Sequence, residues 1–538
     1  MPLRLVPCLI GVAVLVASSA MAAPGAAERI HADVEYLASD LMEGRAAGTR
    51  GHDLAAAFVA TRLRAAGLAP AAGLGGFVQS VPLRRATLTP GSTESRIGEG
   101  GRWRSLGPDA LRIAPSIIAA RLDLDAALMF AGYGIDEPAL GMRDYAGLDP
   151  RGKVVIVLAG APPGLGGEIA AFVKAQKATY AASLGAIGLI EVPAWPRSGG
   201  ATDLGAAAAA ADANGWATLN AAGPEPALAR LTISSRLAER LFEGAPRRLE
   251  DVQRDALGGR RPTGFALAPR LSVKARSVWR DTPSPQLLAR LPGSDPALAA
   301  QSIVLVAHLD HLGRTIAAPG ADDIANGALD NAAGVVILLE AARQLAAAPR
   351  APRRSVVLLV TTGEELGAIG ADFAVSHWPK AAGRPVAALD LDMPLLLYRL
   401  ADIAAPGAEH STIAAALAEA GKPLGIVLAP DPMPHQELLV RSDQLRFIER
   451  GIPAALLVTG HADGGKAAWA NFLAQHYHRP SDDLRQPIRW AEAARLATLV
   501  ADAVRRLADQ PATPGWVQGD FFARRTPPRS ITAGDDGR

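Results

Sequence analysis

Hydrophobic and polar positions form distinct blocks along this chain. Apolar residues recur at helical spacing over residues 27–41, 51–66 and 489–508, which predicts three amphipathic helices. Short apolar, β-branched runs at 355–360, at 386–391 and in the residues that end near Thr459 predict buried strands. Helices and buried strands in one chain are typical of an α/β fold.

The pattern changes between these blocks. Residues 83–112 are polar, glycine-rich and strand-prone, and strand-like runs follow at 127–130, 154–158 and 186–190, with a helical pattern over 169–184. Residues 199–223 are low in complexity and predict a loop. Because 538 residues exceed the size of a typical single domain, we expect two or three units.

The amino terminus has the pattern of an export signal. Arg4 supplies positive charge, residues 6–16 are apolar, and Ala20-Met21-Ala22 fits a small-x-small cleavage site. We therefore expect residues 1–22 to be removed and the protein to be periplasmic or secreted by a bacterium. The one cysteine, Cys8, lies inside this signal, so the mature chain has no disulfide or thiol chemistry.

Charge and hydropathy narrow the range of partners. The net charge is only +2, without a long basic block, and this argues against nucleic acid as a partner. No segment after the signal is long and apolar enough to span a bilayer. The oligomeric state cannot be read from the sequence.

Acidic and imidazole side chains follow the predicted strands in an orderly series. His308 ends an apolar run, with Asp310 two residues later, and this suits a metal ligand whose ring is held by a neighbouring carboxylate. Asp330 precedes a helical pattern of small residues, where one carboxylate could bind two cations. Further along the chain come Glu364-Glu365, Asp390, Asp392 and His478.

Each of these residues alone has an ordinary structural explanation. Asp330-Asn331 would serve as a helix cap, Glu364-Glu365 as a solvated helix start, and His308 with Asp310 as a hydrogen-bonded pair. Their order and their placement argue for more, because open α/β sheets bind ligands at the carboxyl ends of their strands. The series therefore predicts a two-metal hydrolase site.

A family resemblance gives this order a meaning. The segments HLDHLG, NGALDNAAG, TTGEELGAIGADFAV, LDLDM, RSDQLRFIERGIPA and YHRPSD resemble, in that order, the motifs of the M28 family of dizinc aminopeptidases. The resemblance implies a mixed β-sheet flanked by helices, the zinc-exopeptidase or phosphorylase/hydrolase-like fold. It extends to the opening helices, and residues 129–135, 152–158 and 185–190 resemble the protease-associated (PA) domain, a β-rich α+β unit often inserted into that family.

The resemblance also implies roles for individual residues. His308 and Asp392 would bind one zinc, Glu365 and His478 the other, and Asp330 would bridge both. Glu364 would be the general base, Asp310 the partner of His308, and Asp482 a partner near His478. The implied domains are a signal peptide (1–22), the start of the peptidase domain (23–113), the inserted PA domain (114–273), the catalytic domain (274–510) and a mobile tail (511–538).

Three departures from the family pattern concern the neighbourhood of the site. Gln444 stands where the family usually has histidine, and Met393-Pro394 replaces the usual Met-Ile-Gly. Residues 461–476 form an insertion, which we expect beside the site, where it could narrow the entrance for substrate.

Asp390 occupies a position where the family often has asparagine, and we expect it to support the ligands. His311, His461 and His476 have weaker claims to a role.

We therefore expect a cocatalytic exopeptidase that binds two Zn²⁺ and acts on peptides, most simply an aminopeptidase. A carboxypeptidase would need a cation for the substrate carboxylate, and Arg314, Arg441 and Arg446 lie near the motifs. Glutaminyl cyclase, with a single zinc, fits the five-ligand set less well. A catalytically inactive binding protein of this fold and a phosphate-ester hydrolase also stay open. Nitrogen and oxygen ligands would also accept cobalt or manganese.

Overall fold

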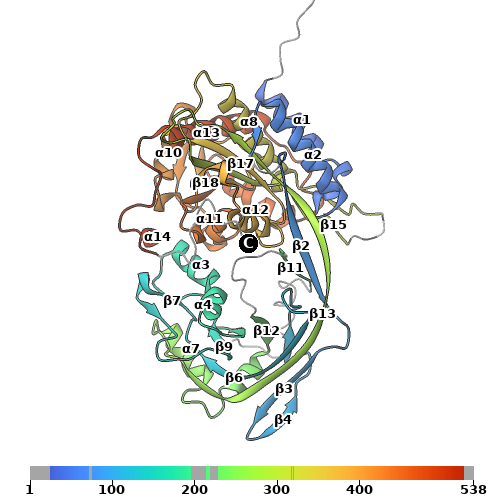
Figure 1. The fold of residues 1–538 in the computed structure, drawn as a ribbon, viewed down its shortest axis with the longest axis vertical. Helices are drawn as coiled ribbons and strands as arrows, with labels where there is room; N and C mark the ends of the chain where they lie inside the picture. Colours follow the sequence, from blue (N-terminus) through green and yellow to red (C-terminus); the bar gives the residue numbers. More distant parts are fainter. Residues whose placement is uncertain are drawn as a thin grey trace, which may run out of the picture.

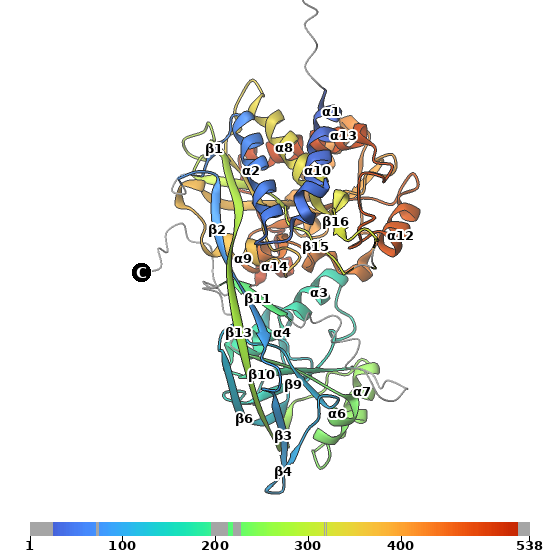
Figure 2. The same ribbon diagram turned by 90° about the vertical axis from the view of Figure 1, so that its right-hand side faces the viewer.

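A long strand joins two units of this protein. The computed structural model describes residues 25–71, 75–194, 214–218, 228–316, 318 and 320–525. Strand β13 (Phe265–Leu291) runs from the lower unit into the upper one beside β2 (Val78–Leu88), as both views show (Figures 1 and 2). The two units therefore share one continuous antiparallel pair of strands.

The upper unit is built on a mixed sheet, as expected. Its centre consists of four parallel strands in the order β17 (Ser355–Thr361), β14 (Gln301–His308), β18 (Arg384–Leu391) and β21 (Ala454–Thr459). Strand β13 is antiparallel to β17 on one side. On the other side, β19 (Asp402–Ala404) is antiparallel to β21 and parallel to β20 (Val427–Ala429).

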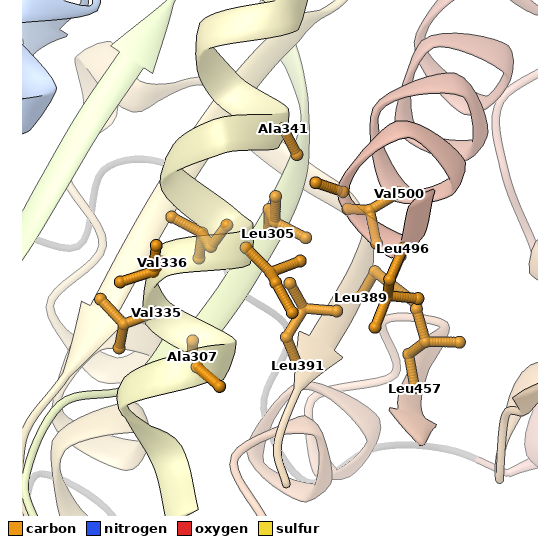
Figure 3. Packing of buried hydrophobic residues seen from close by; sticks show 14 of the residues in the cluster. Leu305, Ala307, Val335, Val336, Ala341, Leu389, Leu391, Leu457, Leu496 and Val500 are labelled. Carbon is orange, nitrogen blue, oxygen red and sulfur yellow. The ribbon is translucent and has the colours of Figure 1, made fainter. Parts of the chain in front are cut away.

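Helices cover both faces of the central strands, which explains why these strands are mainly apolar. One face packs against α8 (Ala333–Ala346) and α13 (Trp490–Asp509), with Leu305, Leu389 and Val336 in the shared core (Figure 3). Helices α1 (Ala26–Leu37), α2 (Arg50–Ala65) and α10 (Ile413–Gly421) extend this layer. The other face packs against α9 (Ile369–Ser376) and α11 (Gln444–Glu449).

The lower unit has its own sheet. Its strands are ordered β4 (Arg102–Ser105), β3 (Glu94–Glu99), β13, β6 (Arg121–Phe130), β9 (Val154–Leu158), β10 (Gly188–Val192), β12 (Ala229–Ile233) and β5 (Leu111–Ile113). Helices α3 (Gly167–Ala175), α4 (Lys177–Ser183), α6 (Ser235–Leu241) and α7 (Leu249–Leu257) pack on it.

The limits of this unit differ from those predicted. Strands β3 to β5 precede residue 114, the expected start of the insertion, yet β3 pairs with β13, β4 with β3 and β5 with β12. Their alternating polar pattern gave no sign of this, because the partners of β3 and β5 lie more than a hundred residues away in the chain. Residues 214–218, expected in a loop, form β11 and pair with β2. The identity of the unit as a PA domain stays a prediction.

The tail expected to be mobile from residue 511 is packed as far as the structure describes it. The short helix α14 (Phe521–Arg524) buries Phe521 and Phe522, and its ring contacts with Phe172 of α3 tie the two units together. In Figure 1, α14 lies beside α3. The proposed signal, residues 1–22, and residues 526–538 lie outside the described residues. None of the described helices has the length and hydropathy that a membrane span requires.

Candidate metal centre

The central strands deliver the candidate residues to one edge of the sheet. His308 is the last residue of β14, Glu364 and Glu365 follow β17, and Asp392 follows β18. Because these strands are parallel, their carboxyl ends meet at the same edge. The chain preceding α8 brings in Asp330, and the turn after α12 (Gly465–Gln475) brings in His478.

The first group of candidate ligands surrounds His308. Its Nε2 atom lies 2.9 Å from Oδ1 of Asp392 and 3.4 Å from Oδ1 of Asp330. Burial lowers the pKa of His308, but the Asp392 and Asp330 carboxylates outweigh this effect and hold that pKa well above its ordinary value. The two carboxylates thus converge on one imidazole nitrogen.

The second group surrounds His478. Its Nε2 atom lies 3.1 Å from Oε2 of Glu365 and 3.4 Å from Oδ2 of Asp330. Asp330 therefore belongs to both groups, because its Oδ1 atom faces His308 while its Oδ2 atom faces His478. This is the arrangement that a carboxylate bridging two cations requires.

His311 is a member of the site whose importance sequence reasoning underestimated. Its buried ring places Nδ1 2.6 Å from Oε1 of Glu365 and 3.9 Å from Oδ2 of Asp330. The ligand atoms of these three residues lie within 4.8 Å of one another. The only sequence signal for a role of His311 in the site is its position three residues after His308. A histidine with an ordinary structural role can have the same spacing.

Two aspartates have different partners from those predicted. The carboxylate of Asp310 does not hold the His308 ring, which is hydrogen-bonded instead to the main-chain oxygen of Asp310 at 3.0 Å. That carboxylate accepts hydrogen bonds from the backbone N–H groups of Glu364 and Glu365, at 3.2 and 3.4 Å. Asp310 therefore fixes the loop that carries both glutamates.

Asp482 acts in the same way on a different loop. Its carboxylate accepts hydrogen bonds from the N–H groups of Leu329 and Asp330, at 3.0 and 2.9 Å, rather than contacting the His478 ring. Burial raises the pKa of Asp482 to about 6. Asp482 thus orients the bridging carboxylate through its backbone.

A buried arginine holds the backbone next to His308 and the backbone ahead of Asp330. Arg45 donates hydrogen bonds to the main-chain oxygens of Leu37, Leu309, Asn326 and Gly327. Burial lowers the pKa of Arg45 to about 10, against the opposing effect of the acidic cluster. Since this value is well above neutrality, Arg45 keeps its positive charge beside the carboxylates.

Glu364 faces the cavity but is not paired with a histidine by any contact found among the described residues. Burial raises the pKa of Glu364 well above its ordinary value, and the Asp392, Glu365 and Asp443 carboxylates add to this effect, while His308 opposes it. A carboxyl group in this environment binds a proton more readily than one in water. Glu364 is thus suited to accept a proton.

Gln444 and Asp390, which depart from the family pattern, make contacts with the backbone near the site. The Gln444 side chain donates hydrogen bonds to the main-chain oxygens of Leu438 and Leu439, at 2.8 and 3.0 Å, so it contacts loop backbone rather than candidate ligands. Asp390 lies behind the site and accepts the Gln444 N–H at 3.0 Å. Burial and the Asp443 carboxylate raise the pKa of Asp390 well above its ordinary value.

A cavity lies beside the candidate ligands. One part of its wall is formed by Asp330, Glu364, Glu365, Asp392 and His478. The rest is mainly apolar and consists of Met393, Met433, Leu438, Leu456, Val458, Trp469, Leu473 and Tyr477, together with Gln436, Arg441 and Ser442. The insertion at 461–476 forms α12 and contributes Trp469 and Leu473, so it borders the cavity, as expected. His461 and His476, at the ends of the insertion, do not line the cavity.

The donor set suits zinc. It consists of imidazole nitrogens and carboxylate oxygens, and donors at about 2.0–2.2 Å from a tetrahedral zinc lie roughly 3.3 Å apart. The separations around His308 and His478, 2.9 to 3.4 Å, agree with this value. Each group thus fits one cation.

Comparison with known proteins assigns this region to a family. The sequence profile of peptidase family M28 matches residues 286–504. None of the curated protein sequences matches the chain.

The chain is also similar to several solved structures, at low identity. An aminopeptidase from Aneurinibacillus sp. strain AM-1 has 20% identity and a TM-score of 0.47, over 90% of this chain and 95% of its own. BSAP, a zinc aminopeptidase from Bacillus subtilis, has 18% identity and a TM-score of 0.43, over 90% and 96%. A peptidase M28 precursor from Shewanella amazonensis SB2B has 17% identity and a TM-score of 0.38, over 91% and 97%.

Proposed function

Because residues 286–504 belong to peptidase family M28, we propose that this protein is a dizinc aminopeptidase that removes amino-terminal residues from peptides. The observation that carries the proposal is the division of the Asp330 carboxylate between His308 and His478, at 3.4 Å from each. Few structural roles would hold one carboxylate between two histidines that each have a further carboxylate partner.

The residues divide into two sets of zinc ligands. His308 and Asp392 would hold one ion, Glu365 and His478 the other, and Asp330 both; His311 lies beside the second set. When bound, zinc supplies a Lewis acid for the peptide carbonyl and makes water more acidic. The carboxylates also reduce the net positive charge of the site, which favours binding of a free substrate amine there.

Glu364 carries the proton transfers in this proposal. It accepts a proton from the attacking water and delivers it to the leaving amine, which needs a carboxylate held close to the reacting atoms. Its loop is fixed by Asp310 through two backbone N–H groups, so the side chain keeps its position during the reaction.

We predict that Glu364→Gln lowers kcat for an aminoacyl-p-nitroanilide by about 10²–10⁴-fold, while zinc content stays at about two per chain. The amide keeps the shape of the side chain but does not accept the proton. The measurement is turnover and zinc content on the same samples, with the exposed Glu419→Gln as a control that should match the unaltered enzyme.

Full turnover in Glu364→Gln would exclude it as the base. If the unaltered enzyme held zinc but left p-nitroanilides intact, acetylated peptides with free carboxyl ends would be the next substrates. Hydrolysis of these peptides would show that the enzyme is a carboxypeptidase and not an aminopeptidase.

A further inference from the structure

We infer that Arg441 forms a binding subsite for the carboxylate of a short peptide substrate, so that the enzyme prefers dipeptides and tripeptides with a free carboxyl end. This inference rests on the proposed function and defines its substrate class. It starts from the lining of the cavity, where Arg441 is the one cationic side chain among the described residues apart from the histidine of the site.

The guanidinium of Arg441 is held in place by neutral groups. Nη1 donates to Oε1 of Gln436 at 2.9 Å, and Nη2 donates to the Tyr477 hydroxyl at 3.2 Å. Within the part of the chain that the structure describes, no carboxylate forms an ion pair with Arg441. An arginine has five N–H donors, so the side chain can still bind a carboxylate.

The other two arginines near the motifs are engaged elsewhere. Arg314 pairs with Asp323 at 2.7 Å. Arg446 pairs with Glu449 at 3.1 Å and donates to the main-chain oxygen of Gly367 at 2.7 Å. Neither lines the cavity, so Arg441 is distinguished from them by both its position and its partners.

Tyr477 connects Arg441 to the candidate ligands. Its hydroxyl accepts from Arg441, and its ring stacks on the His478 ring with centroids 3.8 Å apart. The guanidinium is therefore about one tyrosine side chain away from a zinc ligand. At roughly 3.3–3.6 Å per extended residue, a chain of one or two residues covers such a distance.

The charges along the cavity match those of a short peptide. Four carboxylates and His478 line the part of the cavity where the substrate amine and the peptide bond to be cleaved would bind, and Arg441 reaches the cavity at the hydroxyl of Tyr477, whose ring stacks on His478. A zwitterionic dipeptide or tripeptide presents its charges in this order. A long peptide would bring a neutral amide to Arg441 instead of a carboxylate.

The test compares substrates that differ only in their carboxylates. Leu-Gly carries a terminal carboxylate, Leu-Gly-NH2 carries none, Leu-Asp-NH2 carries one only on its side chain, and Leu-p-nitroanilide reports aminopeptidase activity without any carboxylate. We expect the unaltered enzyme to have a kcat/KM for Leu-Gly about three- to tenfold above that for Leu-Gly-NH2, because Arg441 is exposed and water weakens its ionic hydrogen bond. Leu-Asp-NH2 should resemble Leu-Gly-NH2.

Variants then assign the preference to Arg441. In Arg441→Gln the ratio of kcat/KM for Leu-Gly to that for Leu-Gly-NH2 should fall to near one, and Arg441→Lys should restore part of it. Arg314→Gln, which removes an exposed arginine outside the cavity, should keep the ratio of the unaltered enzyme. A defect that is only structural would lower kcat/KM for both substrates by the same factor and leave their ratio unchanged.

Each contrary outcome has its own meaning. Turnover of Leu-p-nitroanilide without a preference for Leu-Gly, or a preference that survives in Arg441→Gln, would overturn the subsite alone. A preference for Leu-Asp-NH2 equal to that for Leu-Gly would overturn the terminal carboxylate as the group bound. Absence of turnover with every substrate would overturn the proposed function and the subsite with it.

Discussion

Arg45 illustrates how a residue can serve the site without lining its cavity. Its guanidinium binds the main-chain oxygen of Leu309, next to His308, and those of Asn326 and Gly327, ahead of Asp330. It also places a buried positive charge near four carboxylates. Both effects favour a cluster of acids that would otherwise repel one another.

We predict that Arg45→Met lowers zinc affinity by about 10–100-fold, the usual effect of losing a group that orients ligands, and destabilises the fold by about 3–5 kcal/mol. Arg45→Lys should have a zinc affinity and a stability between those of the unaltered protein and Arg45→Met, because an ammonium group cannot bind as many acceptors at once. Competition with a zinc chelator and thermal unfolding are the measurements.

Arg354 offers a matched control for this prediction. It too is fully buried and donates to several main-chain oxygens, among them those of Ala508 and Gln510, but it lies away from the site. Arg354→Met should lose stability and keep its zinc affinity. Equal zinc affinities in the two variants would show that Arg45 has only a structural role.

Individual residues also show where sequence reasoning reaches its limit. Five candidate ligands could be proposed because residue type, order and strand ends agree. The partners of Asp310 and Asp482 could not, since both carboxylates bind backbone N–H groups, which every non-proline residue carries. His311 was underestimated for a related reason: its contact with Glu365 depends on how two loops meet.

At the scale of elements, local pattern predicts some strands well and misses others. Strands β17, β18 and β21 are continuous apolar runs between turns, so their bounds follow closely from the sequence. Strand β13 could not be predicted as one element, because it contains Pro283 and Pro285 and its burial changes along its length. Its continuity depends on pairing with β2, nearly two hundred residues earlier.

Helix α12 shapes the apolar part of the cavity. Trp469 is buried and donates its indole N–H to the main-chain oxygen of Thr459 at 3.0 Å, and Leu473, one turn later, adds a half-buried wall. Leu456 and Val458 line the cavity from β21. With the proposed aminopeptidase activity, we expect this surface to favour a large apolar side chain at the amino-terminal residue of the substrate.

We predict that Leu473→Ala lowers kcat/KM for leucyl-p-nitroanilide about tenfold relative to the alanyl substrate, since each apolar group in such a pocket contributes about 1–3 kcal/mol. Leu428→Ala, equally half-buried but outside the cavity, should leave the ratio of the two substrates unchanged. A constant ratio in Leu473→Ala would mean that α12 does not contact the substrate side chain.

At the scale of the molecule, a charged cluster joins three segments. His410 of the upper unit lies 3.1 Å from Glu168 of α3 and 2.7 Å from Asp520, which precedes α14. Burial lowers the pKa of His410, but the Glu168 and Asp520 carboxylates outweigh this effect and raise that pKa to about 9. Arg525 adds an ion pair with Glu137 of the lower unit at 3.3 Å.

This cluster makes stability depend on pH. The folded-state pKa of about 9 exceeds the unfolded value of about 6.5, so the stabilisation is complete below pH ~6.5 and is lost as pH rises through ~9. We predict that His410→Gln costs on the order of 2 kcal/mol at pH 6, after allowance for solvent screening, and nearly nothing at pH 9.5.

Thermal unfolding of both proteins across this pH range tests the prediction. In the control variant His435→Gln, which changes an exposed histidine, the difference in stability from the unaltered protein should not depend on pH. If the difference in stability between His410→Gln and the unaltered protein stayed constant with pH, or widened at alkaline pH, His410 would not be stabilised in its charged form.

The position of α14 in the chain has a consequence for folding. Phe521 and Phe522 contact Phe172 of α3, and Trp516 donates to the main-chain oxygen of Gly451 at 3.0 Å. Residues 516–525 follow both units in the chain, and the parts of a large protein generally fold as separate units. We therefore predict a folding stage in which both sheets are formed while Phe172 of α3 still faces water, and a chaperone that binds this side chain would act before residues 516–525 cover it.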